Sequence, residues 1–295
     1  MKKTLLFLFF CAAVSTVTAA EAKVLTIGNS FANSLYEYFP LIAKAQGDKL
    51  KLAFANHGGC TIQRHWKYIS EEEKDPAKKH YKIGKEKAKL RELLASDKWD
   101  IISIQQAKSW GTGNFYPELD YLVDYIKKHA PGARIVFHQP WSYREDSKTY
   151  KTLKTTPEKL FAEIEANHLK LSKKYGFEII PAGLAVQIGR NEQKVKYTPV
   201  PRKVAETVKG NNFPPEPGSF FRGWYWKKDP KTGQKILGCD PNHLNSRGRY
   251  LQACVWYGFV FKKSPLEIKY NGKIDPADAA FLRQCADKAL KTYKK

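Results

Sequence analysis

The sequence lacks three features that would each point to a particular class of protein. Beyond residue 22, no apolar run approaches the roughly 20 residues that a membrane-spanning helix needs. No cysteine pair has the C-x-x-C spacing of a structural zinc site, and no repeat of about 20–50 residues indicates a solenoid. With 42% hydrophobic and 27% charged residues over 295 positions, the composition is that of a globular chain.

Acidic residues are scarce as well: 29 Asp and Glu stand against 51 Lys and Arg, which gives a formal net charge of +22. Such an excess favours encounters with anionic partners, and an anionic polysaccharide is one partner that we expect. Nucleic acid is not expected, because the lysines are scattered over helices and loops and form no basic stripe on one reading element.

The first 22 residues have the three parts of a secretory signal peptide. Lys2 and Lys3 give a positive start, residues 5–14 form a short apolar run, and small residues follow. The candidate cleavage sites come after Ala19, Ala20 and Ala22. We therefore expect an exported protein, periplasmic or secreted, with no stable membrane insertion. A buried N-terminal helix is the alternative.

Export makes disulfides chemically accessible. Four cysteines follow the expected signal peptide: Cys60, Cys239, Cys254 and Cys285. They allow three complete pairings, among which the sequence does not choose. Free buried thiols are the alternative.

Strand and helix patterns alternate along the rest of the chain. Short apolar runs, expected as strands, occupy residues 23–27, 50–55, 100–104, 134–138 and 177–180. Helical patterns cover residues 38–46, 86–95, 116–129, 157–175, 182–188, 248–261 and 276–293. Residues 70–89 are expected to be a solvated loop leading into a helix, and 191–238 a long loop insertion. The order predicts one domain over residues 23–295, a three-layer α/β/α fold around a parallel sheet of about five strands.

Residues able to carry chemistry follow several expected strands, at the sheet edge where ligands bind in α/β folds. Ser30 follows the first strand and precedes a helix, where backbone N–H groups can hold an oxyanion; a turn or capping serine is the alternative. Gly58 and Gly59 follow the second strand and allow close backbone approach to a substrate, although a tight turn has the same pattern. Gln105 and Gln106 follow the third strand and offer an amide donor or a capped loop.

Asp240 and His243 lie in a turn near the C-terminal end. A serine nucleophile needs a base, and that base needs an orienting group. The two intervening residues, beginning with Pro241, allow both side chains to face one site. A turn-capping aspartate beside a surface histidine is the alternative. The G-x-S-x-G elbow of other serine hydrolases is absent.

Together, G-N-S-F at residues 28–31, H-G-G-C at 57–60 and D-P-N-H at 240–243 resemble the SGNH (GDSL-like) hydrolase superfamily, and more narrowly an exported bacterial branch of it. The resemblance implies an SGNH/flavodoxin-like sheet with no metal and no organic cofactor. It implies these roles: Ser30 as nucleophile and first oxyanion donor, Gly59 as second donor, His243 as base and Asp240 as its orienting carboxylate. The family's G-x-N-D block is absent, and Gln105 and Gln106 stand in its place. This is similar to sialate O-acetylesterase-like members and implies that the amide of Gln105 or Gln106 is the third oxyanion donor.

The resemblance implies a serine esterase that works through an acyl-enzyme. We expect its substrate to be an acylated carbohydrate, with an O-acetyl ester as the group removed. Trp110 and Trp141, which follow the third and fourth strands, are candidates for stacking on sugar rings; ordinary core packing is the alternative. A lipase or thioesterase, or a non-catalytic glycan-binding protein on the same scaffold, are the alternative functions. The sequence leaves the oligomeric state open.

Overall fold

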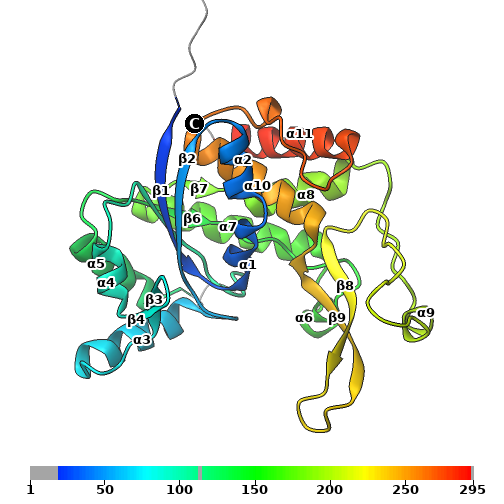
Figure 1. Ribbon diagram of the computed structural model, residues 1–295, viewed down its shortest axis with the longest axis horizontal. Helices are drawn as coiled ribbons and strands as arrows, with labels where there is room; N and C mark the ends of the chain where they lie inside the picture. Colours follow the sequence, from blue (N-terminus) through cyan, green and yellow to red (C-terminus); the bar gives the residue numbers. More distant parts are fainter. Residues whose placement is uncertain (1–18, 112–114, 294–295) are drawn as a thin grey trace, which may run out of the picture.

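A computed structural model of the chain describes residues 19–111 and 115–293 (Figure 1). Residues 1–18, and with them most of the expected signal peptide, lie outside the described residues. The first strand, β1 (Glu21–Gly28), begins two residues before the expected domain start at residue 23. Just before it, the N–H of Ala20 donates a 2.9 Å hydrogen bond to Oδ1 of Asp48. The fold therefore uses residues that the expected boundary gives to the leader.

Five parallel strands form the central sheet. β1 pairs with β2 (Lys49–Asn56) on one side and β5 (Ile101–Ile104) on the other, and β6 (Arg134–His138) and β7 (Ile179–Ile180) continue the sheet beyond β5. The order β2-β1-β5-β6-β7 confirms the predicted three-layer fold with its parallel five-stranded sheet. Because the order reverses at β1, the carboxyl ends of β1 and β5 meet at the switch point where such sheets bind ligands.

Side chains of each strand alternate between two apolar layers. Val24 belongs to one cluster and Leu25 to the other. The helices of the first layer are α2 (Phe39–Ala45), α8 (Ala182–Glu192), α10 (Ser246–Phe261) and α11 (Pro276–Thr292). The helices of the second layer are α3 (Ile62–Lys74), α4 (Leu90–Ala95), α5 (Glu118–His129) and α7 (Pro157–Tyr175). Shorter elements are α1 (Ser30–Asn33), α6 (Lys148–Leu153) and the 3-10 turns Ser34–Tyr36 and Pro265–Glu267.

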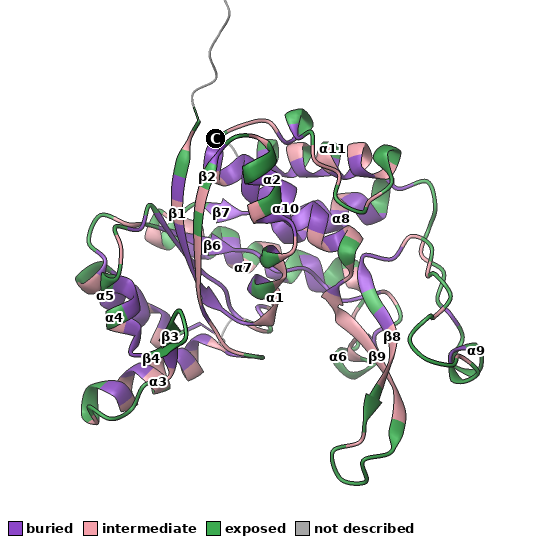
Figure 2. Cartoon of the chain, viewed as in Figure 1, coloured by how far each residue is buried: buried purple, intermediate pink, exposed green. Residues whose placement is uncertain are grey.

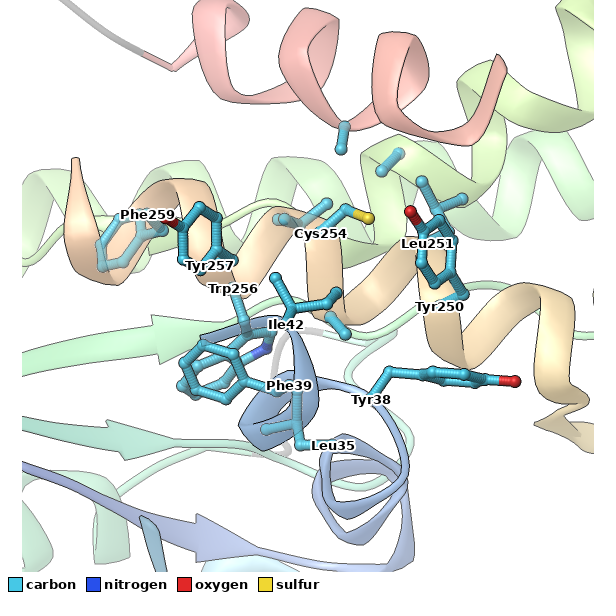
Figure 3. Close-up of a cluster of buried hydrophobic side chains, with 14 of the residues drawn as sticks. Leu35, Tyr38, Phe39, Ile42, Tyr250, Leu251, Cys254, Trp256, Tyr257 and Phe259 are labelled. Carbon is cyan, nitrogen blue, oxygen red and sulfur yellow. The ribbon is translucent and has the colours of Figure 1, made fainter. Parts of the chain in front are cut away.

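The helix α10 fixes the C-terminal half of the expected site. Its residues from Tyr250 to Phe259 are buried, and it packs against α2, α8 and α11. Figure 3 shows Trp256 of α10 near Phe39 of α2, with ring centroids 6.0 Å apart. Because α10 begins three residues after His243 and is buried from Tyr250 to Phe259, it anchors the segment that carries His243.

Helix α3 occupies residues where the sequence, in part, predicts a solvated loop. The buried positions of α3 are Ile62, His65, Ile69 and Glu72. Two of these four are polar, so the apolar periodicity that indicates a helix is incomplete. The buried Glu72 carboxylate accepts hydrogen bonds from the N–H groups of His80 (2.8 Å) and Leu90 (2.9 Å). These bonds tie α3 to α4 and to the small hairpin of β3 (Tyr81–Ile83) and β4 (Glu86–Ala88).

The segment 191–238 also has more regular structure than the expected long loop. It contains the end of α8, the short helix α9 (Arg202–Glu206) and most of a hairpin of β8 (Phe221–Lys228) and β9 (Lys235–Leu244). Figure 1 shows this hairpin projecting from the body, and Figure 2 shows its tip exposed while the base of β8 is mostly buried. Residues 240–243 (D-P-N-H), which the sequence analysis expects in a turn, belong instead to β9 at the base of this hairpin.

Three properties concern the described part of the chain as a whole. Within residues 19–111 and 115–293, the four cysteines are free thiols, as in the alternative that leaves them unpaired: Cys60, Cys239, Cys254 and Cys285. No helix in these ranges is long and apolar enough to cross a bilayer. No group of three His, Cys, Asp or Glu side chains there is placed to hold a metal ion.

Candidate active site

Ser30 stands directly after β1, at the first position of α1. Asn29 caps this helix: its Oδ1 accepts a 3.0 Å hydrogen bond from the N–H of Phe31, and its Nδ2 donates to the Cys60 carbonyl at 3.2 Å. Because Asn29 is the cap, the Ser30 hydroxyl is not used for capping. The Ser30 N–H meets no acceptor among the described residues, so it is an unused donor beside the hydroxyl.

The base of the hairpin brings His243 and Asp240 to this serine. Nε2 of His243 lies 2.8 Å from Oγ of Ser30, and Nδ1 of His243 lies 3.0 Å from both carboxylate oxygens of Asp240. Oδ1 of Asp240 also accepts the N–H groups of Asn242 and His243, at 3.2 and 3.1 Å. The structure thus joins three residues that the sequence predicts as one site, although Ser30 and His243 are 213 positions apart.

The charge of Asp240 is set by opposing effects. Burial alone would raise the pKa of Asp240, but hydrogen bonds from the His243 ring and from the backbone N–H groups lower that pKa below its usual value. The carboxylate is therefore ionised at neutral pH and accepts the Nδ1–H of His243. With the proton held on Nδ1, Nε2 faces Ser30 with a free lone pair.

Gly59 lies in an exposed turn after β2 and has a φ of +58°. This left-handed conformation favours glycine. Its N–H, like that of Ser30, meets no acceptor within the part of the chain that the structure describes. The bond from Asn29 Nδ2 to the Cys60 carbonyl holds this turn against the Ser30 turn. Two unused N–H donors therefore belong to two turns that are bonded to each other.

Gln105 and Gln106, one of which is predicted as the third oxyanion donor, use their side-chain amides in hydrogen bonds within the protein. Oε1 of Gln105 accepts the N–H of Asn29 at 3.2 Å, and its Nε2 donates to the Gln106 carbonyl at 2.8 Å. Oε1 of Gln106 accepts the N–H of Ile62 at 2.9 Å, and its Nε2 donates to Oε1 of Gln63 at 3.2 Å. Both side chains are at most 2% exposed. They hold the Ser30 turn and the start of α3 in place.

Trp141 supports the site from beneath and does not offer a face to a sugar. Its side chain is 1% exposed, its ring stacks on Phe31 with centroids 4.6 Å apart, and its Nε1 donates to the Asn242 carbonyl at 2.9 Å. Phe31 in turn meets the His243 ring edge-on at 5.5 Å. Trp110 is half-buried with its ring edge-on to Tyr143, and a role for it in sugar binding stays a prediction.

His65 is a further residue behind the site. Its Nε2 donates to the Gly28 carbonyl at 2.9 Å, and its Nδ1 accepts from the Tyr81 hydroxyl at 3.0 Å. Burial lowers the pKa of His65 to about 4, so the ring is neutral and can make both bonds. It thereby fixes the end of β1 next to Ser30. In the sequence, only its position five residues after the H-G-G-C motif of residues 57–60 marks it.

A pocket of about 460 Å³ opens over Ser30 and His243. The other residues that line it are Phe31, Asn33, Ser34, Tyr36, Glu37, Trp141, Arg222, Leu244 and Arg249. Sequence reasoning missed the charged members, because Arg222 and Arg249 lie far from Glu37 in the chain and have no motif of their own. The lining combines charged and hydroxyl-bearing side chains with the aromatic rings of Phe31, Tyr36 and Trp141 and with Leu244.

Comparisons place this chain among proteins with the same fold. A sequence family described as Domain of unknown function (DUF4886) matches residues 23–198, and no curated protein matches. A crystal structure of a DUF4886 family protein from Bacteroides uniformis is 24% identical, with a TM-score of 0.70, over 93% of this chain and 96% of that one.

Two further solved structures align less closely. A candidate SGNH hydrolase from Slackia heliotrinireducens is 14% identical, with a TM-score of 0.45, over 80% of this chain and 97% of that one. A candidate GDSL-like lipase from Parabacteroides merdae is 13% identical, with a TM-score of 0.47, over 83% and 98%. The family match includes Ser30, Gly59 and both glutamines and ends before the hairpin. The chain belongs to the DUF4886 family.

Proposed function

We propose that this protein is a serine ester hydrolase. The observation that carries the proposal is the chain of contacts from Ser30 Oγ to His243 Nε2 at 2.8 Å and from His243 Nδ1 to Asp240 at 3.0 Å. This is the arrangement of nucleophile, base and orienting carboxylate that acyl transfer requires.

The reaction has two steps. His243 Nε2 takes the Ser30 hydroxyl proton while Oγ attacks the ester carbonyl, and the alcohol leaves with that proton, so that an acyl-serine remains. A water molecule then gives a proton to Nε2 while its oxygen attacks the acyl carbonyl; the bond to Oγ breaks, Nε2 returns the proton to Oγ, and the acyl group leaves as the free acid. The unused N–H groups of Ser30 and Gly59 are the proposed oxyanion donors, each worth about 2.7–4 kcal/mol of transition-state stabilisation.

We propose an O-acetyl ester on a carbohydrate as the substrate. Charged and hydroxyl-bearing side chains interrupt the apolar lining that Phe31, Tyr36, Trp141 and Leu244 give this pocket, whereas a long acyl chain needs a continuous apolar slot. At its rim, Tyr36 is 60% exposed and stacks on Phe54 with ring centroids 4.0 Å apart. A flat aromatic ring held in this way is a suitable surface for the apolar face of a sugar.

The experiment compares Ser30→Ala with Ser96→Ala, an exposed serine at the end of α4 whose hydroxyl bonds only to the Leu93 carbonyl. We expect Ser30→Ala to lose about 10⁴-fold or more in hydrolysis of p-nitrophenyl acetate, and Ser96→Ala to match the wild type. Acetate release from acetylated xylan should exceed turnover of p-nitrophenyl octanoate.

Equal rates for the wild type and Ser30→Ala would refute the hydrolase and leave the non-catalytic glycan-binding alternative. Faster turnover of the octanoate than of acetylated glycan would favour a lipase or thioesterase. Circular dichroism and thermal melting of each variant separate a lost nucleophile from a lost fold.

A further inference from the structure

Arg222 reaches the site because the hairpin is irregular at this residue. The pairing of β8 with β9 shifts between Phe221 and Gly223, which leaves Arg222 without a partner in the ladder. Gly223 has a φ of +75°, and a Cβ there would lie 2.0 Å from Oε2 of Glu216. Glu216 is itself held by the buried Arg144, at 2.6 Å. The bulge is therefore built into the packed base of the hairpin.

The guanidinium of Arg222 keeps most of its hydrogen-bonding capacity. Its nearest carboxylate oxygen is Oδ2 of Asp240 at 3.6 Å, beyond hydrogen-bond distance, and its side chain is 49% exposed. It lies over the Tyr225 ring, 5.7 Å from the centroid. Arg249, the other arginine of the pocket, is engaged: it bonds to Glu37 at 2.5 Å and to the Leu244 carbonyl at 2.9 Å.

A second hollow of about 250 Å³ continues from the far side of Arg222. Besides Arg222, its lining combines Phe213, Pro214, Pro215, Phe221 and Trp224 with the polar Asn211, Ser219 and Asn245 and with Glu216, the acid that Arg144 holds. The indole of Trp224 is fixed by a 2.8 Å hydrogen bond from its Nε1 to the Val200 carbonyl. Arg222 lines both hollows, so one substrate that extends past it would meet an aromatic surface on the side away from Ser30.

We propose that Arg222 selects acidic substrates: acetylated oligosaccharides that carry a carboxylate or sulfate close to the scissile ester and extend by a further sugar toward Trp224. This inference rests on the proposed ester hydrolysis at Ser30. A guanidinium presents a planar fork of N–H donors that matches an oxyanion group with two parallel hydrogen bonds. An anion bound on the exposed side of this guanidinium would share it with Asp240, whose Oδ2 lies 3.6 Å from Nη1 of Arg222.

The test uses the mature chain that remains after removal of the expected signal peptide. The substrates are acetylated xylo-oligosaccharides, oligogalacturonates and sulfated galactan oligosaccharides of similar length. The wild type should have a kcat/KM at least about tenfold higher on one of the two anionic substrates than on the neutral one. Arg222→Gln should remove this preference by raising KM, and Arg222→Lys should restore part of it. Lys227→Gln, an exposed cation of β8 outside both hollows, should keep it.

The neutral ester p-nitrophenyl acetate separates specificity from damage to the catalytic residues. Arg222→Gln should lower kcat/KM on the preferred anionic substrate by at least about tenfold more than on this neutral ester. An equal fall on every substrate would overturn the proposal and make Arg222 a support for Asp240, and an unchanged preference in Arg222→Gln would also overturn it.

Binding distinguishes this inference from failure of the proposed function. Quenching of tryptophan fluorescence measures the Kd of oligogalacturonate and of sulfated galactan. For the acid that the wild type prefers, the Kd should be at least about tenfold lower for Ser30→Ala than for the double variant Ser30→Ala, Arg222→Gln. If the wild type hydrolyses no ester but this Arg222-dependent binding is present, the hydrolase fails while the acidic-saccharide site stands. Equal binding by both variants contradicts the site.

Discussion

Asp240→Asn should abolish most of the activity without unfolding the protein. The Asp240 carboxylate accepts three kinds of hydrogen bond: from the N–H of Asn242 at 3.2 Å, from the N–H of His243 at 3.1 Å and from Nδ1 of His243 at 3.0 Å. An asparagine retains one oxygen for the backbone bonds. Its nitrogen is a donor, however, so the Nδ1 of His243 becomes the acceptor and the ring proton moves to Nε2, where it faces Ser30.

The size of the loss follows from these contacts. A hydrogen bond to a charged acceptor is worth about 1.5–3 kcal/mol, which is roughly 10–150-fold in rate, since 1.36 kcal/mol is a factor of ten. The inverted tautomer adds to this, because a protonated Nε2 cannot accept the serine proton. The total expected is about 10⁴-fold, as for the same change in serine-protease triads. Stability should fall by less than about 1 kcal/mol, because the backbone bonds remain.

Initial rates on p-nitrophenyl acetate and thermal melting measure both quantities. Asp229→Asn is the matched control, because Oδ1 of Asp229 likewise accepts two backbone N–H groups, from Lys231 and Thr232, at the exposed tip of the same hairpin. It should keep full activity. More than a tenth of the wild-type rate in Asp240→Asn at an unchanged Tm would refute the reasoning, and a large fall in Tm would give Asp240 a structural role instead.

Two further predictions concern stability and processing. Burial lowers the pKa values of His65, His138 and His168 to about 4, 3 and 4. The unfolded chain takes up these three protons near pH 6.5, whereas the folded chain does not. The free energy of unfolding should therefore fall by about 4 kcal/mol per pH unit as the pH drops from about 6 to 4.5. A flat free energy of unfolding in urea over this range would contradict it. We also propose export with cleavage after Ala19: cleavage after Ala19 or Ala20 keeps β1 whole, but only cleavage after Ala19 keeps the Ala20 nitrogen beside Asp48. The intact mass of secreted protein checks it, and a mature chain beginning at Glu21 or Lys23 is the contrary result.

The elements that the sequence predicts best are those buried on a regular pattern. β6 (Arg134–His138) and α7 (Pro157–Tyr175) have the predicted bounds, because one is an apolar run and the other has a Thr156 cap, a proline in its first turn and a glycine after its end. α3 is less predictable, since its buried face includes His65 and Glu72, whose polarity is satisfied only by contacts with distant residues.

The sequence predicts the residues of the candidate site best where their side chains can act together in only one way. Ser30, His243 and Asp240 have complementary chemistry, and the fold brings them into contact. Gln105 has both a donor and an acceptor, so its sequence position does not decide its partners, and it turns its oxygen to the Asn29 N–H. Arg222 depends on a bulge, a feature of strand pairing that no local pattern of residues encodes.

The hairpin of β8 and β9 has a consequence for how this protein could diversify. Asp240 and His243, the proposed carboxylate and base, lie on β9, Arg222 lies on β8, and Ser30, the proposed nucleophile, begins α1 after the first strand of the sheet. A change of this hairpin therefore alters Asp240, His243 and Arg222 together, whereas Ser30 belongs to a separate part of the chain. A chimera that exchanges residues 221–244 between relatives would transplant both properties in one step, and the family match at residues 23–198 would not register the exchange.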